Sequence, residues 1–365
     1  MTVLYDATEL RRELHPLAEL GLEVSHTADF VLEKLHALGI DAHRIADTNG
    51  VLGIIKGTEP GPVMMLRSDM DALPFKNPDG STVAIHACGH DAHMAMLLAA
   101  ASRLVGKIRR GTLKLLFQPA EETLEGAPLM IKKGVVDDVD IAIGAHIRPI
   151  QDLKPGTMCA GVMYNGFAFP RVTFKGKPAH GSRPHLGANA VDAAAAAIAA
   201  VNGIHMTPDV HWTIAPTQIQ SDGPMNIIPS VCRVRFDVRA KSNPVINELL
   251  EKFKRAVTFA AESYGCEAEI NIGTVGPAPD YDPELEKEIS SCIEELGPGI
   301  LAPNCGGGGE DFNFYKIYKP SMRTAYFGVG VGAAPGLHDR NLHFDDTFLP
   351  KGSEIFVKMA LRHLG

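Results

Sequence analysis

Cysteine, histidine and carboxylate residues gather at a few points of this 365-residue sequence. The densest group is the segment HACGHDAH, which begins at His86 and contains Cys88 and His90. Other candidates are Asp69, Asp71, Glu121, Glu122, His146 and His338. Thiolate, imidazole and carboxylate groups are the usual ligands of borderline transition metals. We therefore expect a metal site, and a carboxylate beside it could accept a proton from water during hydrolysis.

Each of these residues also has a purely structural interpretation. An isolated pair such as Asp69 and Asp71 is typical of a turn followed by a helix cap, and adjacent acidic residues suit a helix start. His146 could be a core histidine, and Cys88 could be a small buried hydrophobic residue or a nucleophile. The metal hypothesis is favoured because the candidates follow several separate apolar runs. His90 beside Cys88 also fits a metal loop better than a Cys–His dyad.

The elements that must position these residues are readable from the apolar pattern. The runs VLGII, PVMML, LKLLF and DIAIG are short and apolar on both faces, as buried strands are. The segments 6–21, 26–39 and 91–105 show helical spacing. This alternation predicts a mixed, largely parallel, doubly wound α/β sheet. Ligands bind beyond the carboxyl ends of the strands of such sheets, where the candidate residues lie.

From Phe167 the pattern changes to β-α-β-β-α-β, the order of a ferredoxin-like unit. FAFPRVTFKG is predicted to be one strand, and SVCRVRFDVRA alternates like a half-buried strand, with Val231, Val234 and Phe236 set among arginines. We therefore expect an inserted domain over 166–276. The metal-binding catalytic domain would then be discontinuous, over 1–165 and 277–365.

Composition excludes several classes of function. There are 43 acidic and 35 basic residues, and the formal net charge of −8 disfavours nucleic acid as a partner. The longest apolar stretch, AVDAAAAAIAAV, is too short and too weakly apolar to span a bilayer. The charged N-terminal segment lacks the apolar region of a secretory signal. Six scattered cysteines fit a reduced, cytoplasmic location, without a membrane partner.

Read together, eight motifs resemble those of the M20 metallopeptidase family, in the family's order. The resemblance is greatest to the branch of aminoacylases, hippurate hydrolases, indoleacetyl-amino-acid hydrolases and N-acetyldiaminopimelate deacetylases. The motifs are RSDMDALP from Arg67, HACGHDAH from His86, QPAEE from Gln118, GAHIRP from Gly144, KPAHGSRPHLGAN from Lys177, MNIIPS from Met225, GEDF from Gly309 and LHDRNLHFDD from Leu337.

The resemblance implies a catalytic domain with two divalent metal ions per subunit, which could be Mn, Zn, Co or Ni. It also implies that the inserted domain acts as a lid and forms a homodimer. The implied metal ligands are Cys88, His90, Glu122, His146 and His338.

The same resemblance assigns roles to four further residues. Glu121 is the implied general base, and Asp71 the residue that orients His90 or the metal bridge. His180 would stabilise the oxyanion, and Asn226 would contact the substrate. His338 is chosen over His343 because LHDRNLHFDD aligns with the family's pattern at its first histidine.

Three functions remain open at this stage. The first is metal-dependent hydrolysis of the amide bond of an N-acyl or N-aroyl amino acid. The second is deamination of an aryl amine at the same site, with release of ammonia, and the third is a non-catalytic metal-binding protein. Two departures from the family pattern bear on the substrate: a short segment after Pro74, and Asp339-Arg340 where Ser-Pro is common.

Overall fold

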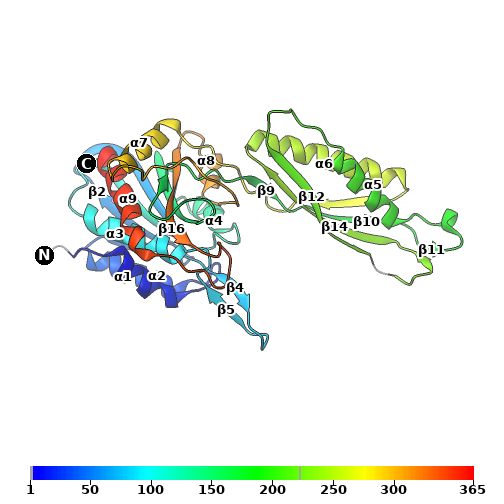
Figure 1. Ribbon diagram of the computed structural model, residues 1–365, viewed down its shortest axis with the longest axis horizontal. Coiled ribbons are helices and arrows are strands. Elements are labelled where there is room, and N and C mark those ends of the chain that lie inside the picture. Colours follow the sequence, from blue (N-terminus) through cyan, green and yellow to red (C-terminus); the bar gives the residue numbers. More distant parts are fainter. Residues whose placement is uncertain (1–2, 222) are drawn as a thin grey trace. The chain divides into compact units, whose positions relative to one another are not determined.

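A computed structural model of the chain describes residues 3–221 and 223–365. The chain divides into two compact units (Figure 1). Unit 1 comprises the residues up to Met163 together with Asp280–Gly365, and unit 2 comprises Tyr164–Pro279. Unit 1 is therefore discontinuous, and the chain leaves it and returns to it once. Each unit is described by itself.

The centre of unit 1 is a sheet of seven strands within the described residues. Its order is β1 (Asp41–Arg44), β2 (Val51–Lys56), β6 (Arg110–Gln118), β3 (Glu59–Asp69), β7 (Ile141–Pro149), β16 (Arg323–Ala333) and β8 (Met158–Cys159). The four inner strands β6, β3, β7 and β16 are parallel, and the outer strands β1, β2 and β8 pair antiparallel. The prediction of a mixed, largely parallel sheet is confirmed.

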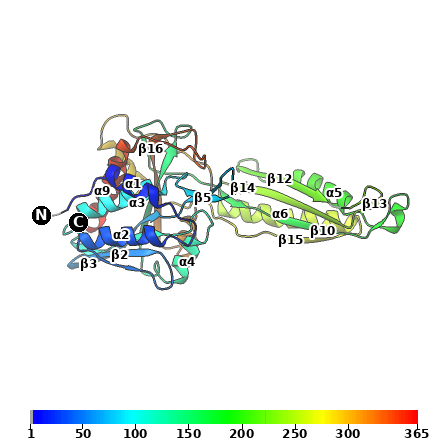
Figure 2. The ribbon, with the colours of Figure 1, turned by 90° about the horizontal axis from the view of Figure 1, so that it is seen from below.

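Helices cover both faces of this sheet. The helices of unit 1 are α1 (Ala7–Leu14), α2 (Ser25–Ala37), α3 (His90–Leu104), α4 (Gly126–Lys132), α7 (Pro283–Glu294), α8 (Asn313–Tyr318) and α9 (Leu349–Leu364). On one face α1, α3 and α9 pack together (Figure 2), and Leu66, Ile143 and Phe327 of the sheet join their apolar core. On the other face α4 packs against β6 and α8. Strands buried on both sides account for the continuous apolar runs in the sequence.

Two expected elements are interrupted by proline. The helix predicted over 6–21 ends at Leu14, and a short 3₁₀ turn, His15–Leu17, follows it. The strand predicted over FAFPRVTFKG is divided into β9 (Gly166–Ala168) and β10 (Arg171–Lys175) around Pro170. Proline has no amide hydrogen to donate, so it ends a regular hydrogen-bond pattern in both places. In both places the pattern of apolar residues alone predicted an element that is longer than the one in the structure.

Unit 2 has the predicted β-α-β-β-α-β order. Its further elements are α5 (Ala190–Asn202), β12 (Trp212–Ser221), β14 (Val231–Ala240), α6 (Asn243–Ser263) and β15 (Glu267–Asn271). The strands pair antiparallel in the order β12-β14-β10-β15, and β9 pairs with part of β14. The buried side of β14 carries Cys232, Val234, Phe236 and Val238. Val231 is only partly buried, because it lies on the alternate face from Val234.

The described residues also form two small two-stranded pairs. In unit 1, β4 (Leu73–Lys76) and β5 (Thr82–Ile85) form a two-stranded hairpin from the segment after the Asp69–Asp71 loop. In unit 2, β11 (Ala179–His180) pairs with β13 (Ile227–Ile228). Across the described residues, every helix falls short of the length or the apolar character needed to cross a bilayer.

Candidate metal centre

The predicted site residues of unit 1 come together at the carboxyl ends of its parallel strands. Asp69 is the last residue of β3, and His146 lies in the second half of β7. Gln118 ends β6, directly before the loop that carries Glu121 and Glu122. The topology of an open α/β sheet therefore brings side chains from distant parts of the chain to one edge.

Cys88, His90 and His146 form a buried group in which one ligand atom from each lies within 4.8 Å of the others. The Cys88 Sγ is 3.4 Å from the His146 Nε2. The His146 Nδ1–H donates to the carbonyl oxygen of Ile147. Because that bond fixes the proton on Nδ1, the Nε2 lone pair faces the thiol and is available to a metal.

Glu122 and His338 extend this group. Their ligand atoms lie within 4.8 Å of each other and of the Cys88 Sγ, and the His338 Nε2 is 3.6 Å from the Glu122 Oε2. The backbone N–H of His338 donates to the carbonyl oxygen of Ala87, which ties the two ligand-bearing loops together. His343, the alternative in the sequence, is exposed and its ring bonds the carbonyl oxygen of Asn341.

Asp71 positions the loop that carries Glu121 and Glu122. Its two carboxylate oxygens accept hydrogen bonds from the backbone N–H groups of Glu121 (2.9 Å) and Glu122 (3.1 Å). Ala120, just before them, has a φ of 59°, a conformation that costs energy for a residue other than glycine. Asp71 also approaches His90, at 3.6 Å from its Nδ1. The carboxylate therefore orients both sides of the group at once.

Negative charge is concentrated around His90. The Nε2 of this ring lies 3.7 Å from a Glu122 oxygen and 3.8 Å from oxygens of Glu121 and Asp69. Burial alone lowers the pKa of His90, but Asp69 and the Cys88 sulfur outweigh it and raise that pKa well above its usual value. Burial, then the neighbouring carboxylates Glu310 and Glu122, raise the pKa of Glu121 strongly. Such a cluster favours a bound cation.

The donor set fits a divalent transition metal. Both ring nitrogens of His90 and one oxygen of Glu122 are buried without a hydrogen-bond partner among the described residues. Burial lowers the pKa of His146 well below its usual value, so this imidazole is neutral, the form that ligates metals. Burial and Glu122 raise the pKa of the Cys88 thiol, so metal binding there must displace a proton.

The other histidines of HACGHDAH have different surroundings. His93 is fully used by the protein: its Nδ1 bonds Asp69 at 2.6 Å and its Nε2 accepts from the Ile147 N–H at 3.0 Å. It is therefore a positioning residue for Asp69 and β7. His86 is buried, and burial lowers its pKa to about 4, so it is neutral.

A buried charged network supports the metal centre, and Asp69 is the one member of it that the sequence analysis gave as a candidate. The Arg67 guanidinium bonds Asp69 at 2.8 Å and Asp311 at 2.6 Å, and it lies 3.2 Å from Glu310. Asp311 also accepts from Gln118. These residues belong to the motifs RSDMDALP, QPAEE and GEDF. For the members other than Asp69, their place in those motifs was the only sign in the sequence that they have a role.

Unit 2 brings its two candidate residues together. His180 lies in β11 and Asn226 directly precedes β13, and the Gly181 N–H donates to the carbonyl oxygen of Asn226 at 2.7 Å. The His180 Nδ1 accepts from the Ser182 N–H at 3.2 Å. In a neutral imidazole this leaves the proton on Nε2, so the exposed ring can act as a hydrogen-bond donor.

A departure from the family pattern has a structural consequence. The Arg340 guanidinium donates to the carbonyl oxygen of Lys76 at 2.9 Å and also bonds the Asn77 side chain. Arg340 follows the candidate ligand His338 by two residues. It therefore ties the β4–β5 hairpin to the loop that carries that ligand.

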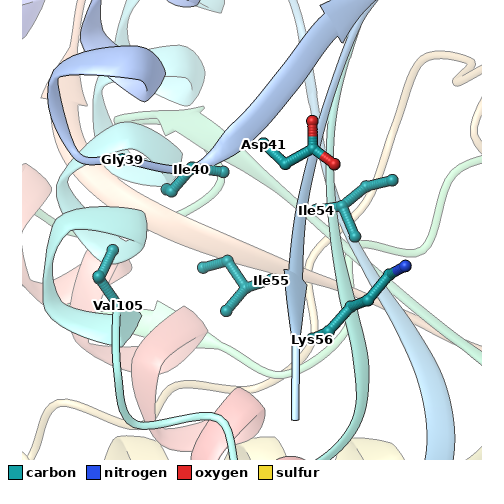
Figure 3. Close-up of a pocket in the computed structure, with 7 residues that line it drawn as sticks. All are labelled: Gly39, Ile40, Asp41, Ile54, Ile55, Lys56 and Val105. Carbon is teal, nitrogen blue, oxygen red and sulfur yellow. The ribbon is translucent and has the colours of Figure 1, made fainter.

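A surface pocket in unit 1 is unrelated to this centre. Its volume is about 310 Å³, and Figure 3 shows the side chains that line it. Its lining is Gly39, Ile40, Asp41, Ile54, Ile55, Lys56 and Val105. None of these is a candidate ligand, so the chemistry of the protein is assigned to the strand ends and not to this pocket.

Comparison with known proteins agrees with this geometry. The pattern that defines peptidase family M20/M25/M40 matches residues 65–362. The hippurate hydrolase of Campylobacter jejuni is 29% identical, over 98% of this chain and 96% of its own. The N-acetyl-L-cysteine deacetylase of Bacillus subtilis is also 29% identical, over 97% of this chain and 87% of its own.

A solved structure is similar over the whole chain. The YXEP protein of Bacillus subtilis, described as a dinuclear metal-binding peptidase from the M20 family, superposes with a TM-score of 0.83 at 26% identity. The match covers 98% of this chain and 97% of that one. The chain belongs to peptidase family M20/M25/M40. The predicted family and the prediction of a hydrolytic enzyme are thereby confirmed.

Proposed function

We propose that this protein is a metal-dependent amidohydrolase that cleaves the amide bond of an N-acyl or N-aroyl amino acid. The observation that carries the proposal is the buried group of ligand atoms with Glu121 beside it. The proposed ligands of two divalent ions, which could be Mn, Zn, Co or Ni, are Cys88, His90, Glu122, His146 and His338. The names of the relatives, a hippurate hydrolase and an N-acetyl-L-cysteine deacetylase, support this substrate class.

When bound, divalent ions would polarise the substrate carbonyl and lower the pKa of a water molecule. Glu121 would take the proton from that water and deliver it to the leaving nitrogen. Burial and the neighbouring carboxylates raise the pKa of Glu121, which strengthens the tendency of this carboxylate to accept a proton. Asp71 would hold Glu121 in place through the backbone bond described above.

His180 would donate a hydrogen bond to the oxyanion that forms during attack on the carbonyl. Its Nε2–H is the free donor when Nδ1 accepts from Ser182. Removing one such donor typically costs a factor of about 10²–10³ in kcat. Asn226, beside His180 in unit 2, would contact the substrate. We further propose that unit 2 acts as the lid over the site.

The general base is tested by replacing Glu121 with Gln. We expect kcat to fall by a factor of about 10²–10⁴, the usual contribution of a positioned base. Metal content, measured by mass spectrometry of the purified protein, should remain unchanged. Glu125→Gln is the matched control, because Glu125 lies in the same loop but is exposed. Full activity of the Glu121→Gln protein would overturn the assignment.

The substrate is tested with a panel of N-acetyl amino acids, N-benzoyl amino acids and aryl amines, assayed with Mn and with Zn. We expect release of a free amino acid from an acylated substrate. Release of ammonia from an aryl amine alone would instead support deamination. Tight metal uptake without turnover of any member would support the non-catalytic alternative.

We also propose that two copies of the chain pair through unit 2. In support, β12 pairs with a neighbour on only one side in the described chain, and most of its residues are exposed, including Ile219. Unpaired strand edges of this kind are templates for pairing with another chain. Light scattering should give the mass of a dimer, and the mass of a single chain would contradict the proposal.

A further inference from the structure

Two cysteines of unit 1 lie against each other, and neither is among the candidate metal ligands. The Sγ atoms of Cys159 and Cys305 are 3.5 Å apart. Cys159 is buried in β8, whereas Cys305 is partly exposed in the loop that precedes the GEDF motif. Both are free thiols. The mechanism proposed above uses neither of them.

Backbone hydrogen bonds hold the two cysteines in this arrangement. The Ala302 N–H donates to the carbonyl oxygen of Met158 at 2.8 Å, and the Met163 N–H donates to that of Cys305 at 2.6 Å. The segments 158–163 and 300–305 therefore run side by side. The closeness of the two sulfur atoms follows from this backbone pairing and not from one side-chain rotamer.

The immediate surroundings favour reaction at this pair. The Cys305 thiol bonds the Cys159 sulfur and lowers the pKa of Cys159 to about 7. The same bond raises the pKa of Cys305. One thiolate shares a proton with the adjacent thiol, and the thiolate is the form that reacts with oxidants. The partial exposure of Cys305 gives a small oxidant access.

We propose that Cys159 and Cys305 are a redox modification site, which forms a reversible disulfide on exposure to a peroxide. One thiolate attacks a peroxide oxygen, the O–O bond breaks, and a sulfenic acid forms with loss of hydroxide. The second sulfur then displaces the sulfenic OH, so the S–S bond forms as the S–O bond breaks. In total two thiols and one hydrogen peroxide give one disulfide and two waters.

The disulfide would restrain a glycine-rich segment that leads to the charged network. Cys305 is followed by Gly306–Gly309 and then by Glu310 and Asp311, which face Arg67. Bond formation shortens the sulfur separation from 3.5 Å to about 2.0 Å. Because four glycines have few conformational restrictions, fixing the end of the segment reduces its freedom.

The test uses the full-length protein treated with hydrogen peroxide, alkylated and mapped by mass spectrometry. We expect a peptide pair joined through Cys159 and Cys305, which dithiothreitol separates again. Hydrogen exchange in residues 305–309 should slow severalfold on oxidation. Peroxide could also oxidise Cys88 and so reduce activity. Neither of these two measurements is an activity assay, so oxidation of Cys88 does not affect their result.

Cysteine variants test whether the crosslink joins Cys159 to Cys305. Cys159→Ala and Cys305→Ala should each lose the crosslink and the change in hydrogen exchange. Cys232→Ala, a buried cysteine of unit 2, should keep both. If peroxide leaves both thiols of the wild-type protein open to alkylation, or carries them to sulfinic acid without a crosslink, the proposal is wrong.

Discussion

Arg67 is the residue on which the arrangement of the buried acids depends most. Its side chain is completely buried and contacts three carboxylates, those of Asp69, Asp311 and Glu310. Asp69 in turn bonds His93 and lies near His90, so the guanidinium acts on the metal centre through other side chains. Burial, ahead of the opposing charge of Arg67, raises the pKa of Asp311 to about 8. The network is therefore sensitive to loss of its cation.

We predict that Arg67→Met destabilises the protein by about 3–5 kcal/mol, because it leaves buried carboxylates without the cation that balances their charge. The measurement is the free energy of unfolding in urea. Arg12→Met is the control, because Arg12 pairs with Asp346 but its side chain is 64% exposed. Loss of such a surface pair should cost about 1 kcal/mol or less. Equal losses in the two variants would contradict the role given to Arg67.

Glu121 should reduce the stability of the metal-free protein at neutral pH. Burial and the adjacent carboxylates raise its pKa, so the folded state binds more protons than the unfolded state above about pH 4. The free energy of unfolding therefore falls as pH rises through that window. Glu121→Gln lacks this titration and should be more stable than wild type by about 1 kcal/mol at pH 7.

The comparison requires chelator-treated protein and denaturant titrations at several pH values. The advantage of Glu121→Gln should disappear near pH 3, well below the unfolded pKa of about 4.3, because the wild-type carboxyl is then protonated in both states. An advantage of the same size at every pH would mean that packing and not charge is responsible.

At the scale of elements, the buried strands and the central helix of unit 1 were predictable, whereas several short elements were not. β3, β6, β7 and α3 were evident from apolar periodicity, because each is buried along most of its length. Short elements such as α8 and β8 owe their form to contacts distant in sequence, which no local pattern records. The sequence analysis also grouped Val231 with Val234 and Phe236 in β14, but Val231 lies on the opposite face of the strand and is only partly buried.

The candidate ligands were recognisable in the sequence, whereas most of the residues that support them were not. Cys88, His90 and Glu122 are recognisable by residue type and motif. The link between Arg67 and Asp311 joins residues 244 positions apart, and only the fold brings them together. His93 was part of an obvious cluster, but its bond to the backbone of Ile147 could not be inferred from the sequence.

A helix cap in unit 1 gives a prediction at this scale. Asp282 caps α7 by accepting from the Glu284 and Leu285 N–H groups, and it also pairs with Arg323 of β16. Asp282→Ala should cost about 1 kcal/mol at pH 7, the usual loss for such a cap. The Arg323 hydrogen bond lowers the pKa of Asp282, so this stabilisation is present above the unfolded pKa and is lost as pH falls through the folded value.

Urea unfolding between about pH 2 and 7 measures the effect, since the unfolded carboxyl has a pKa of about 3.9. Asp282→Asn is the matched control: the amide oxygen retains a cap, but Arg323 loses its nearer carboxylate and keeps only Glu288, at 3.7 Å. Its stability difference from wild type should shrink on acidification. A pH-independent difference in both variants would show that the ion pair contributes nothing.

At the scale of the whole molecule, the described residues form two separate apolar cores. One surrounds α3 and α9 in unit 1, and the other lies between α5, α6 and the sheet of unit 2. The candidate metal ligands all belong to unit 1, whereas His180 and Asn226 belong to unit 2. A reaction that uses the metal ligands as well as His180 and Asn226 would therefore need residues from both units. Each unit nevertheless has its own apolar core to stabilise it.

This division predicts that a metal ion stabilises one unit and not the other. A ligand that binds only the folded state raises its stability by about 2.7 kcal/mol at a free concentration of 100 times its Kd. The sequence has one tryptophan, Trp212, which lies in β12 of unit 2. Its fluorescence therefore follows the unfolding of unit 2, whereas circular dichroism follows the helices and strands of both units.

We expect addition of Mn to chelator-treated protein to raise the midpoint of a thermal transition seen by circular dichroism. The midpoint seen by Trp212 fluorescence should stay unchanged. His146→Ala should remove the circular dichroism shift, because it takes away a proposed ligand without altering unit 2. A rise of the fluorescence midpoint together with the circular dichroism midpoint would contradict this prediction. It would show that the two units unfold as one cooperative body, because metal binding in unit 1 would then also raise the unfolding temperature of unit 2, which contains Trp212.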